Sequence, residues 1–134
     1  MEIREYAEFR EEEIRELYQS VGWQLYVADM AALKESFSNS LLVLAAYQDD
    51  ELLGLCRIIG DGINTVILQD VLVSPCHQRQ GIGSKLVKAA LERYQSVRQV
   101  LLVTDDTPET RAFYASLGFR NFGELGLCGF MKIN

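Results

Sequence analysis

Two glycines stand one residue apart in the stretch PCHQRQGIGSKL, residues 75–86, where a strand-like run gives way to a helix-like one. Gln78 precedes Gly81 by three residues, and Ser84 follows Gly83. A helix that begins near Gly81 leaves its first amide N–H groups without partners, and its dipole places about half a positive charge there. Glycine also lets an anion approach the backbone closely. The stretch therefore predicts a phosphate-binding loop, and a pyrophosphate is its natural ligand.

The side chains near this loop favour the same interpretation. Arg79, Lys85 and Lys88 concentrate positive charge in a chain whose net charge is −6. Two familiar nucleotide-binding motifs do not fit. A P-loop has a Gly-Lys-Ser/Thr triplet, which this stretch lacks. A dinucleotide-binding fingerprint has a third glycine, where this chain has Lys85 and Leu86.

Composition limits the remaining classes of function. A chain of 134 residues is predicted to form a single domain over residues 1–134. The acidic net charge argues against nucleic acid as a partner, because phosphate backbones bind basic surfaces. The N-terminus has no apolar signal core, and no run approaches the roughly 18 apolar residues of a membrane span. We expect a cytoplasmic protein that does not bind membranes.

The cysteines and the histidine offer little chemistry of their own. Cys56, Cys76 and Cys128 are scattered without paired spacing, and His77 is the only histidine. Neither a disulfide framework nor a metal site is predicted. A catalytic triad would have to use His77, and no serine elbow accompanies it. Cys76, next to the glycine loop, is the cysteine with the best prospect of reactivity.

Hydrophobic periodicity indicates the elements that hold this loop. Helices are expected over 8–21, from Asp29 onwards, over 81–94, and from Thr107 to Gly118. Strands are expected over 2–6, 41–47, 52–59, 64–73, 100–104 and 126–133. The wholly apolar run 100–104 is typical of a strand buried on both faces. The strand, helix and strand around the glycine loop predict a parallel pair in an otherwise antiparallel sheet.

Two stretches resemble the GNAT superfamily of acetyl-CoA-dependent N-acetyltransferases. DVLVSPCHQRQGIGSKLV, residues 70–87, is similar to its acetyl-CoA signature: a strand, a proline-containing turn, and Gln/Arg-x-x-Gly-x-Gly opening a helix. FYASLGF, residues 113–119, resembles its second recurrent stretch, although Thr107 and Thr110 stand where the family often has Asn and Ala. The resemblance implies an α+β fold with a mixed, mostly antiparallel sheet. This sheet would have six to seven strands with a central parallel pair and about four flanking helices.

The resemblance also implies a cosubstrate, acetyl-CoA, and its binding residues. The CoA pyrophosphate would lie on the backbone of residues 78–84, and the pantetheine arm would pair with the main chain of Val71 and Val73. The pairing would occur where the two parallel strands splay apart. The residues implied in CoA binding are Val71, Leu72, Val73, Gln78, Arg79, Gln80, Gly81, Ile82, Gly83, Ser84, Phe113 and Tyr114.

The implied reaction is direct attack of an acceptor amine on the thioester in a ternary complex. The backbone N–H of Val71 would stabilise the developing oxyanion, a contribution typically of ~3 kcal/mol. The Tyr114 hydroxyl would protonate the departing CoA thiolate. A purely structural role for Tyr114 is the alternative. Phe113 already marks the buried stripe of that helix, however, and Tyr114 is turned about 100° from it.

The acceptor side is less defined by the sequence. Asp70 is a candidate to bind the amine or relay its proton through water, although it faces away from Val71 unless a bulge intervenes. The alternative is a buried carboxylate paired with a residue such as Arg57. Trp23 and Tyr26 are candidates to line the acceptor cleft, or they pack in the core. The acceptor would be an amine of a small molecule or peptide.

A different class of function also fits the same residues. The chain could be a non-catalytic domain that senses CoA or binds a partner protein on the same fold. A monomer or a homodimer is expected in either case.

Overall fold

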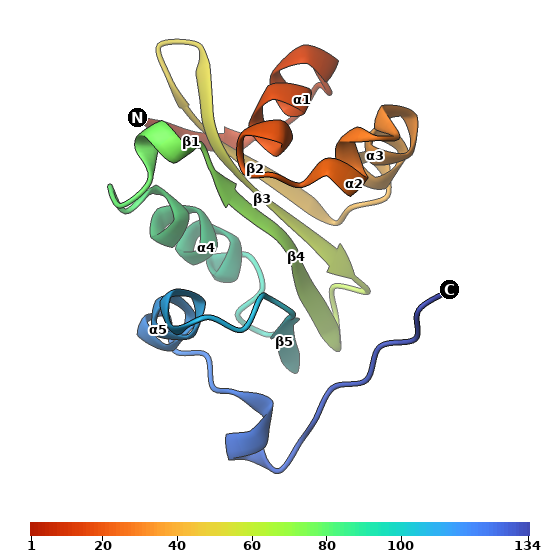
Figure 1. Ribbon diagram of the computed structural model, residues 1–134. Helices are drawn as coiled ribbons and strands as arrows, with labels where there is room; N and C mark the ends of the chain where they lie inside the picture. Colours follow the sequence, from red (N-terminus) through yellow and green to blue (C-terminus); the bar gives the residue numbers. More distant parts are fainter. The chain divides into compact units, whose positions relative to one another are not determined.

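A five-stranded sheet organises the computed structural model, which describes all 134 residues (Figure 1). The strands are β1 (Glu2–Glu5), β2 (Leu42–Gln48), β3 (Glu51–Gly60), β4 (Thr65–Val73) and β5 (Gln99–Leu102). The α-helices are α1 (Glu11–Ser20), α2 (Gln24–Val27), α3 (Met30–Ser38), α4 (Ile82–Glu92) and α5 (Pro108–Ser116). Two short 3₁₀ helices are η1 (Pro75–His77) and η2 (Phe122–Leu125). The chain separates into two units, Met1–Val103 and Thr104–Asn134, and each is described by itself.

The strands follow one another across the sheet in chain order, from β1 to β5. The first four pair antiparallel, and β4 pairs with β5 in parallel from Thr65↔Gln99 to Leu68↔Leu102. The predicted parallel pair is therefore confirmed, but it lies at the edge of the sheet and not at its centre. The α+β class is also confirmed, with five strands where six to seven were expected.

Helices cover both faces of this sheet within the first unit. Helices α1 to α3 lie on one face and α4 lies on the other (Figure 1). Leu55 and Leu72, which are register partners on β3 and β4, belong to the core beneath α1 and α3. Gly54, one residue before Leu55, faces α4 closely: a Cβ built there would lie 3.2 Å from Leu86 Cδ1. Asp70 shares the α1 face because it has the same parity as Leu72.

The N-terminal helices follow the predicted pattern with one addition. The helix expected over 8–21 is present as α1, and Ile14, Leu17 and Tyr18, which recur at helical spacing, are buried on it. The Asp29 carboxylate accepts from the Ala32 N–H at 3.0 Å, which makes it the N-cap of α3. A separate short helix, α2, forms in GWQLYVA and brings the count to five α-helices where about four were expected.

The second unit contains α5, η2 and an extended end. Thr107 and Thr110 form a capping box at the start of α5. The predicted strand over 126–133 is wrong, because the chain after η2 has no strand structure and Phe130 is 96% exposed. Gly126, Gly129 and the adjacent apolar pair Phe130 and Met131 break the alternation that a half-buried strand needs.

Strand β5 also differs from its prediction. All four of its residues are half-buried, whereas a wholly apolar run had indicated burial on both faces. The cause is its place at the end of the sheet, where a strand has one neighbour only. No helix of the chain has the length and hydropathy needed to cross a membrane.

Candidate acyl-CoA and acceptor site

The open edge of β4 is the first component of the site. Pairing with β5 ends at Leu68, so residues 69–73 have no partner on that side. The Ser74 N–H donates to the Leu53 carbonyl on β3 at 2.8 Å. Because backbone groups of alternate residues point to opposite sides of a strand, those of Val71 and Val73 point away from β3. Two residues of β4 therefore present their peptide groups at an unpaired edge.

The loop after β4 leads from this edge to the start of α4. The Gln78 side chain donates from Nε2 to the Val73 carbonyl at 3.0 Å, which ties the loop to the strand end. Arg79 (φ 65°) and Gly81 (φ 81°) both adopt left-handed conformations. For Arg79 this geometry costs about 1–2 kcal/mol, a strain that tends to occur at functional sites.

The N-terminus of α4 has no side-chain cap. The first N–H bond into the helix is made by Lys85 to the Gly81 carbonyl at 3.0 Å. The preceding amides of Ile82, Gly83 and Ser84 therefore lie in the uncapped first turn. No acidic residue lies in that turn, and Gln80 and Lys85 are exposed beside it. The arrangement suits an anion.

Asp70 lies in a buried polar cluster on the face of β4 that α1 covers. Its carboxylate is 2% exposed and accepts from Arg57 Nε at 2.7 Å. It also accepts from the hydroxyl of Tyr18 at 2.9 Å and from that of Tyr26 at 2.8 Å. The ion pair that the sequence left as an alternative for Asp70 is thus present, and Tyr18 is a partner that the sequence reasoning missed.

A β-bulge produces this placement. The register of β3 and β4 shifts between Arg57 and Ile58, so Asp70 opposes Arg57 while Gln69 is the additional residue. Gln69 is exposed and donates from Nε2 to the Tyr26 hydroxyl at 3.4 Å. A signal for the pair existed in the sequence, since Arg57 is the one charged residue inside the apolar run LLGLCRII.

The pKa values of Tyr18, Tyr26 and Arg57 are all raised in this cluster, by burial or by neighbouring charges. Burial raises the pKa of Tyr18 far above its usual range, and the Asp70 charge adds to the effect. Burial also raises the pKa of Tyr26. Burial by itself lowers the pKa of Arg57, but the Asp70 carboxylate more than offsets this, so the net pKa is raised. These shifts keep both phenols neutral and the Arg57 guanidinium charged at neutral pH.

Trp23 and Tyr26 lie at the outer side of the cluster, and both are half-buried. The Tyr26 ring makes an edge contact with Tyr18 at 5.3 Å between centroids and lies 6.2 Å from the Trp23 ring. The structure therefore brings Trp23, Tyr26 and Asp70 together. Val71, Leu72 and Val73 form the end of β4, from which the glycine loop begins.

Phe113 and Tyr114 belong to the second unit. Both are half-buried on α5, and their rings meet edge to face at 4.9 Å between centroids. The Tyr114 ring also contacts Phe119 at 5.7 Å. Tyr114 is thus neither a fully buried core residue nor an exposed one. Phe113 was expected to lie in the buried stripe of this helix, but it is only half-buried.

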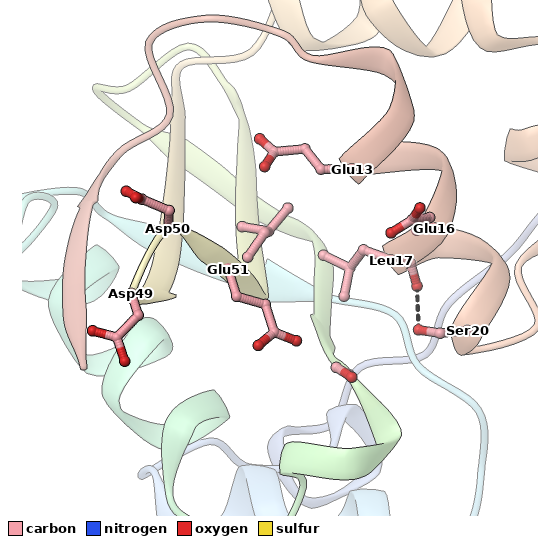
Figure 2. A pocket seen from close by; sticks show the side chains of 9 residues that line it. Glu13, Glu16, Leu17, Ser20, Asp49, Asp50 and Glu51 are labelled. Atoms are coloured by element: carbon pink, nitrogen blue, oxygen red, sulfur yellow. Dashed lines mark hydrogen bonds between the residues drawn. The ribbon is translucent and has the colours of Figure 1, made fainter.

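A separate acidic pocket lies between α1 and the turn that joins β2 to β3 (Figure 2). Its volume is about 490 Å³, and its lining includes Glu13, Glu16, Asp49 and Asp50. Glu13 accepts from the hydroxyls of Tyr6 and Tyr47, and burial together with the Glu13 bond raises the Tyr47 pKa to about 12. The residues that line this pocket do not include Trp23, Tyr26 or Asp70.

No group of three or more His, Cys, Asp or Glu side chains is placed to hold a metal ion. All three cysteines are free thiols. Cys56 is buried, and burial raises its pKa to about 12. Cys76 and Cys128 are exposed.

Comparison with known proteins identifies the family. Residues 39–121 match the acetyltransferase (GNAT) domain. An uncharacterised ycf52-like N-acetyltransferase of Prochlorococcus marinus is 30% identical over 91% of this chain and 69% of its own length. A ycf52 N-acetyltransferase of Gracilaria tenuistipitata is 26% identical, and the match covers 60% of its length. This chain belongs to the GNAT acetyltransferase family, whose members carry out acyl-CoA-dependent transfer.

Solved structures agree with this assignment. A GNAT-family acetyltransferase of Streptococcus pneumoniae, SP0256, is 37% identical, with a TM-score of 0.90 over 99% of this chain and 97% of its own. An aminoglycoside 6'-N-acetyltransferase solved with coenzyme A is 25% identical, with a TM-score of 0.68 over 79% of this chain and 63% of its own.

Proposed function

We propose that this chain is an acetyl-CoA-dependent N-acetyltransferase that acts on an amine of a small molecule or peptide. One observation carries the proposal: the unpaired edge of β4 is followed, after the loop 74–81, by the uncapped N-terminus of α4. A strand edge can pair with an extended amide-containing arm, and a helix N-terminus can bind a pyrophosphate. CoA carries both groups, the amides of its pantetheine arm and its pyrophosphate. Family membership supports the same assignment.

The residues present fit this cosubstrate. The peptide groups of Val71 and Val73 would pair with the pantetheine amides, although the Val73 carbonyl already accepts from Gln78. A carbonyl oxygen has a second lone pair, so both bonds can coexist. The amides of residues 78–84 would hold the pyrophosphate, and Arg79 would add charge. The Leu72 side chain faces the core and its peptide groups point toward β3, so Leu72 would hold Val71 and Val73 in place and would not contact CoA itself.

Acetyl-CoA supplies an activated acetyl thioester when bound. The Val71 N–H, at the open edge, would donate to the carbonyl oxygen as the acceptor nitrogen attacks. The Tyr114 hydroxyl would give its proton to the departing sulfur, an assignment that rests on the FYASLGF motif. The reaction would proceed by direct attack in a ternary complex.

Asp70 would act in this reaction by positioning and not as a free base. Its carboxylate accepts from Arg57, Tyr18 and Tyr26 at the same time and is 2% exposed. Water would then take the proton of the ammonium before attack, or the small neutral fraction of the amine would attack and lose its N–H proton to water afterwards. We also propose a cytoplasmic location and a monomer or homodimer for this enzyme.

Calorimetric titration with acetyl-CoA, followed by an amine panel with thiol release as the readout, tests the proposal. We expect saturable binding, a raised melting temperature and thiol release that depends on an amine. Binding without any amine-dependent release would indicate a CoA-sensing domain. The absence of binding would contradict the proposed function altogether.

A further inference from the structure

The polar cluster around Asp70 reaches the surface through Tyr26 and Gln69. Asp70 and Arg57 are 2% and 4% exposed, whereas Tyr26 is half-buried and Gln69 is exposed. The direction of each hydrogen bond in this cluster determines what its outer end offers to a ligand.

The Tyr26 hydroxyl can only accept from a ligand. A carboxylate accepts and never donates, so the single Tyr26 proton is committed to Asp70 Oδ1 at 2.8 Å. The Tyr26 oxygen in turn accepts from an Arg57 nitrogen at 3.3 Å and from Gln69 Nε2 at 3.4 Å. Both contacts are longer than a typical N–H···O bond, so a better-placed donor can displace the Gln69 contact.

The same argument determines the orientation of the Gln69 amide. Because the Tyr26 oxygen has no proton to give, Gln69 must approach it with its NH₂ group. Its carbonyl oxygen is then available as a second acceptor. Arg57 does not add an exposed positive charge, because its nitrogens bond Asp70, Ser40 and Tyr26. Two neutral acceptor oxygens therefore form the outer end.

We infer that Tyr26 and Gln69 hold the nitrogen of the acceptor amine by N–H···O bonds, and that Asp70 and Arg57 are positioning residues that act through Tyr26. The inference rests on the proposed function. Gln69 lies two residues before Val71, about 7 Å along β4, at the start of its open edge. An ammonium or amine group carries several N–H donors, which suits a pair of acceptors. The Trp23 ring adds an aromatic surface that favours a cation.

Trp23 is the only tryptophan of the chain, so its fluorescence reports on this site directly. The experiment titrates the full-length protein and its variants with butylammonium chloride at constant ionic strength, adjusted with sodium chloride. We expect a saturable change in the parent and a Kd at least about tenfold weaker in Tyr26→Phe.

Tyr18→Phe is the matched control, because it also removes a hydroxyl that donates to Asp70 but lies fully buried. It should lose stability while its butylammonium Kd stays within about threefold of the parent's. Gln69→Leu, at an exposed position, should fold normally and weaken the Kd several-fold.

An unchanged Kd in both Tyr26→Phe and Gln69→Leu, or the absence of a saturable response in the parent, would overturn the inference. Calorimetry with acetyl-CoA separates this failure from that of the proposed function. If acetyl-CoA binds and butylammonium does not, the amine site is wrong and the acyl-CoA site stands. If butylammonium binds and acetyl-CoA does not, the proposed function fails.

Discussion

The two ends of the candidate site are built from different materials. At the CoA end the binding groups belong to the backbone, namely the open edge of β4 and the first turn of α4. At the acceptor end they are the side chains of Tyr26 on α2 and Gln69 on β4, and a buried cluster of Tyr18 on α1, Arg57 on β3 and Asp70 supports them. The first end is made from one continuous stretch, and the second requires four segments to meet. Changes at the CoA end should alter binding of the cosubstrate. Changes at the acceptor end should alter folding stability and binding of the amine.

The largest effect is expected at the side-chain end. Asp70→Asn leaves Arg57 buried without a counterion, which typically costs about 3–5 kcal/mol of unfolding free energy. Urea denaturation measures this loss. Asp106→Asn breaks an exposed pair with Arg111 and should change the unfolding free energy by less than about 1 kcal/mol. If Asp70→Asn were as stable as the parent but acetylated amines slowly, Asp70 would be a chemical participant and the positioning role would be wrong.

Gly83→Val should break the backbone end alone. Gly83 lies in the first turn of α4, and its φ is not in the positive range. A branched side chain there would block approach of the pyrophosphate to the amides, so the acetyl-CoA Kd should rise about 100-fold or more in calorimetry. The melting temperature without ligand should change little. Undiminished acetyl-CoA binding would contradict the phosphate-binding role of the loop.

Gly81→Ala needs a control for backbone strain. Gly81 and Gly22 share a φ of 81°, and a Cβ at either would meet no atom within 4 Å. Alanine at each should therefore cost a similar 1–2 kcal/mol of stability. Weaker acetyl-CoA binding in Gly81→Ala but not in Gly22→Ala would separate ligand contact from strain. Equal binding in both would show that Gly81 serves the loop conformation only.

Tyr114→Phe should affect the chemical step and neither end of the binding site. The change removes one oxygen and keeps the ring packed against Phe113 and Phe119. Loss of a general acid should lower kcat by roughly 10- to 100-fold, with acetyl-CoA affinity within about threefold of the parent's. Single-turnover kinetics would establish that chemistry limits the rate. A parental rate under that condition would assign Tyr114 a structural role.

The smallest effect is expected for Arg79→Gly. Glycine relieves the left-handed strain at this position, so stability should stay equal to the parent's or rise by up to about 1 kcal/mol. Loss of the cation should weaken acetyl-CoA binding several-fold at low salt and less at high salt, because exposed charges are screened. A salt-independent loss would indicate that Arg79 shapes the loop and does not attract the phosphates.

The same contrast explains what the sequence could predict. The strand, loop and helix around Gly81 could be predicted from local signals: hydrophobic periodicity, the residues that start helices, and the conformational freedom of glycine. The helix start at Asp29 also depends only on neighbouring residues. The Tyr18–Asp70 bond joins residues 52 positions apart and has no local signature. From the sequence, the Arg57–Asp70 ion pair could be stated only as an alternative. The bulge at Gln69 determines which face of the sheet the Asp70 side chain occupies, and the sequence does not show where a bulge lies. The short helix α2 was missed because four residues are too few for a periodic pattern.

The buried thiol of Cys56 can report how often the central strand β3 becomes exposed. The thiol has no exposed surface, and its raised pKa of about 12 keeps it protonated at neutral pH. An alkylating reagent should therefore modify Cys76 and Cys128 in the native protein and reach Cys56 only when β3 opens. The slow phase of alkylation, followed by mass spectrometry, would then report how often the centre of the protein opens, without any introduced label.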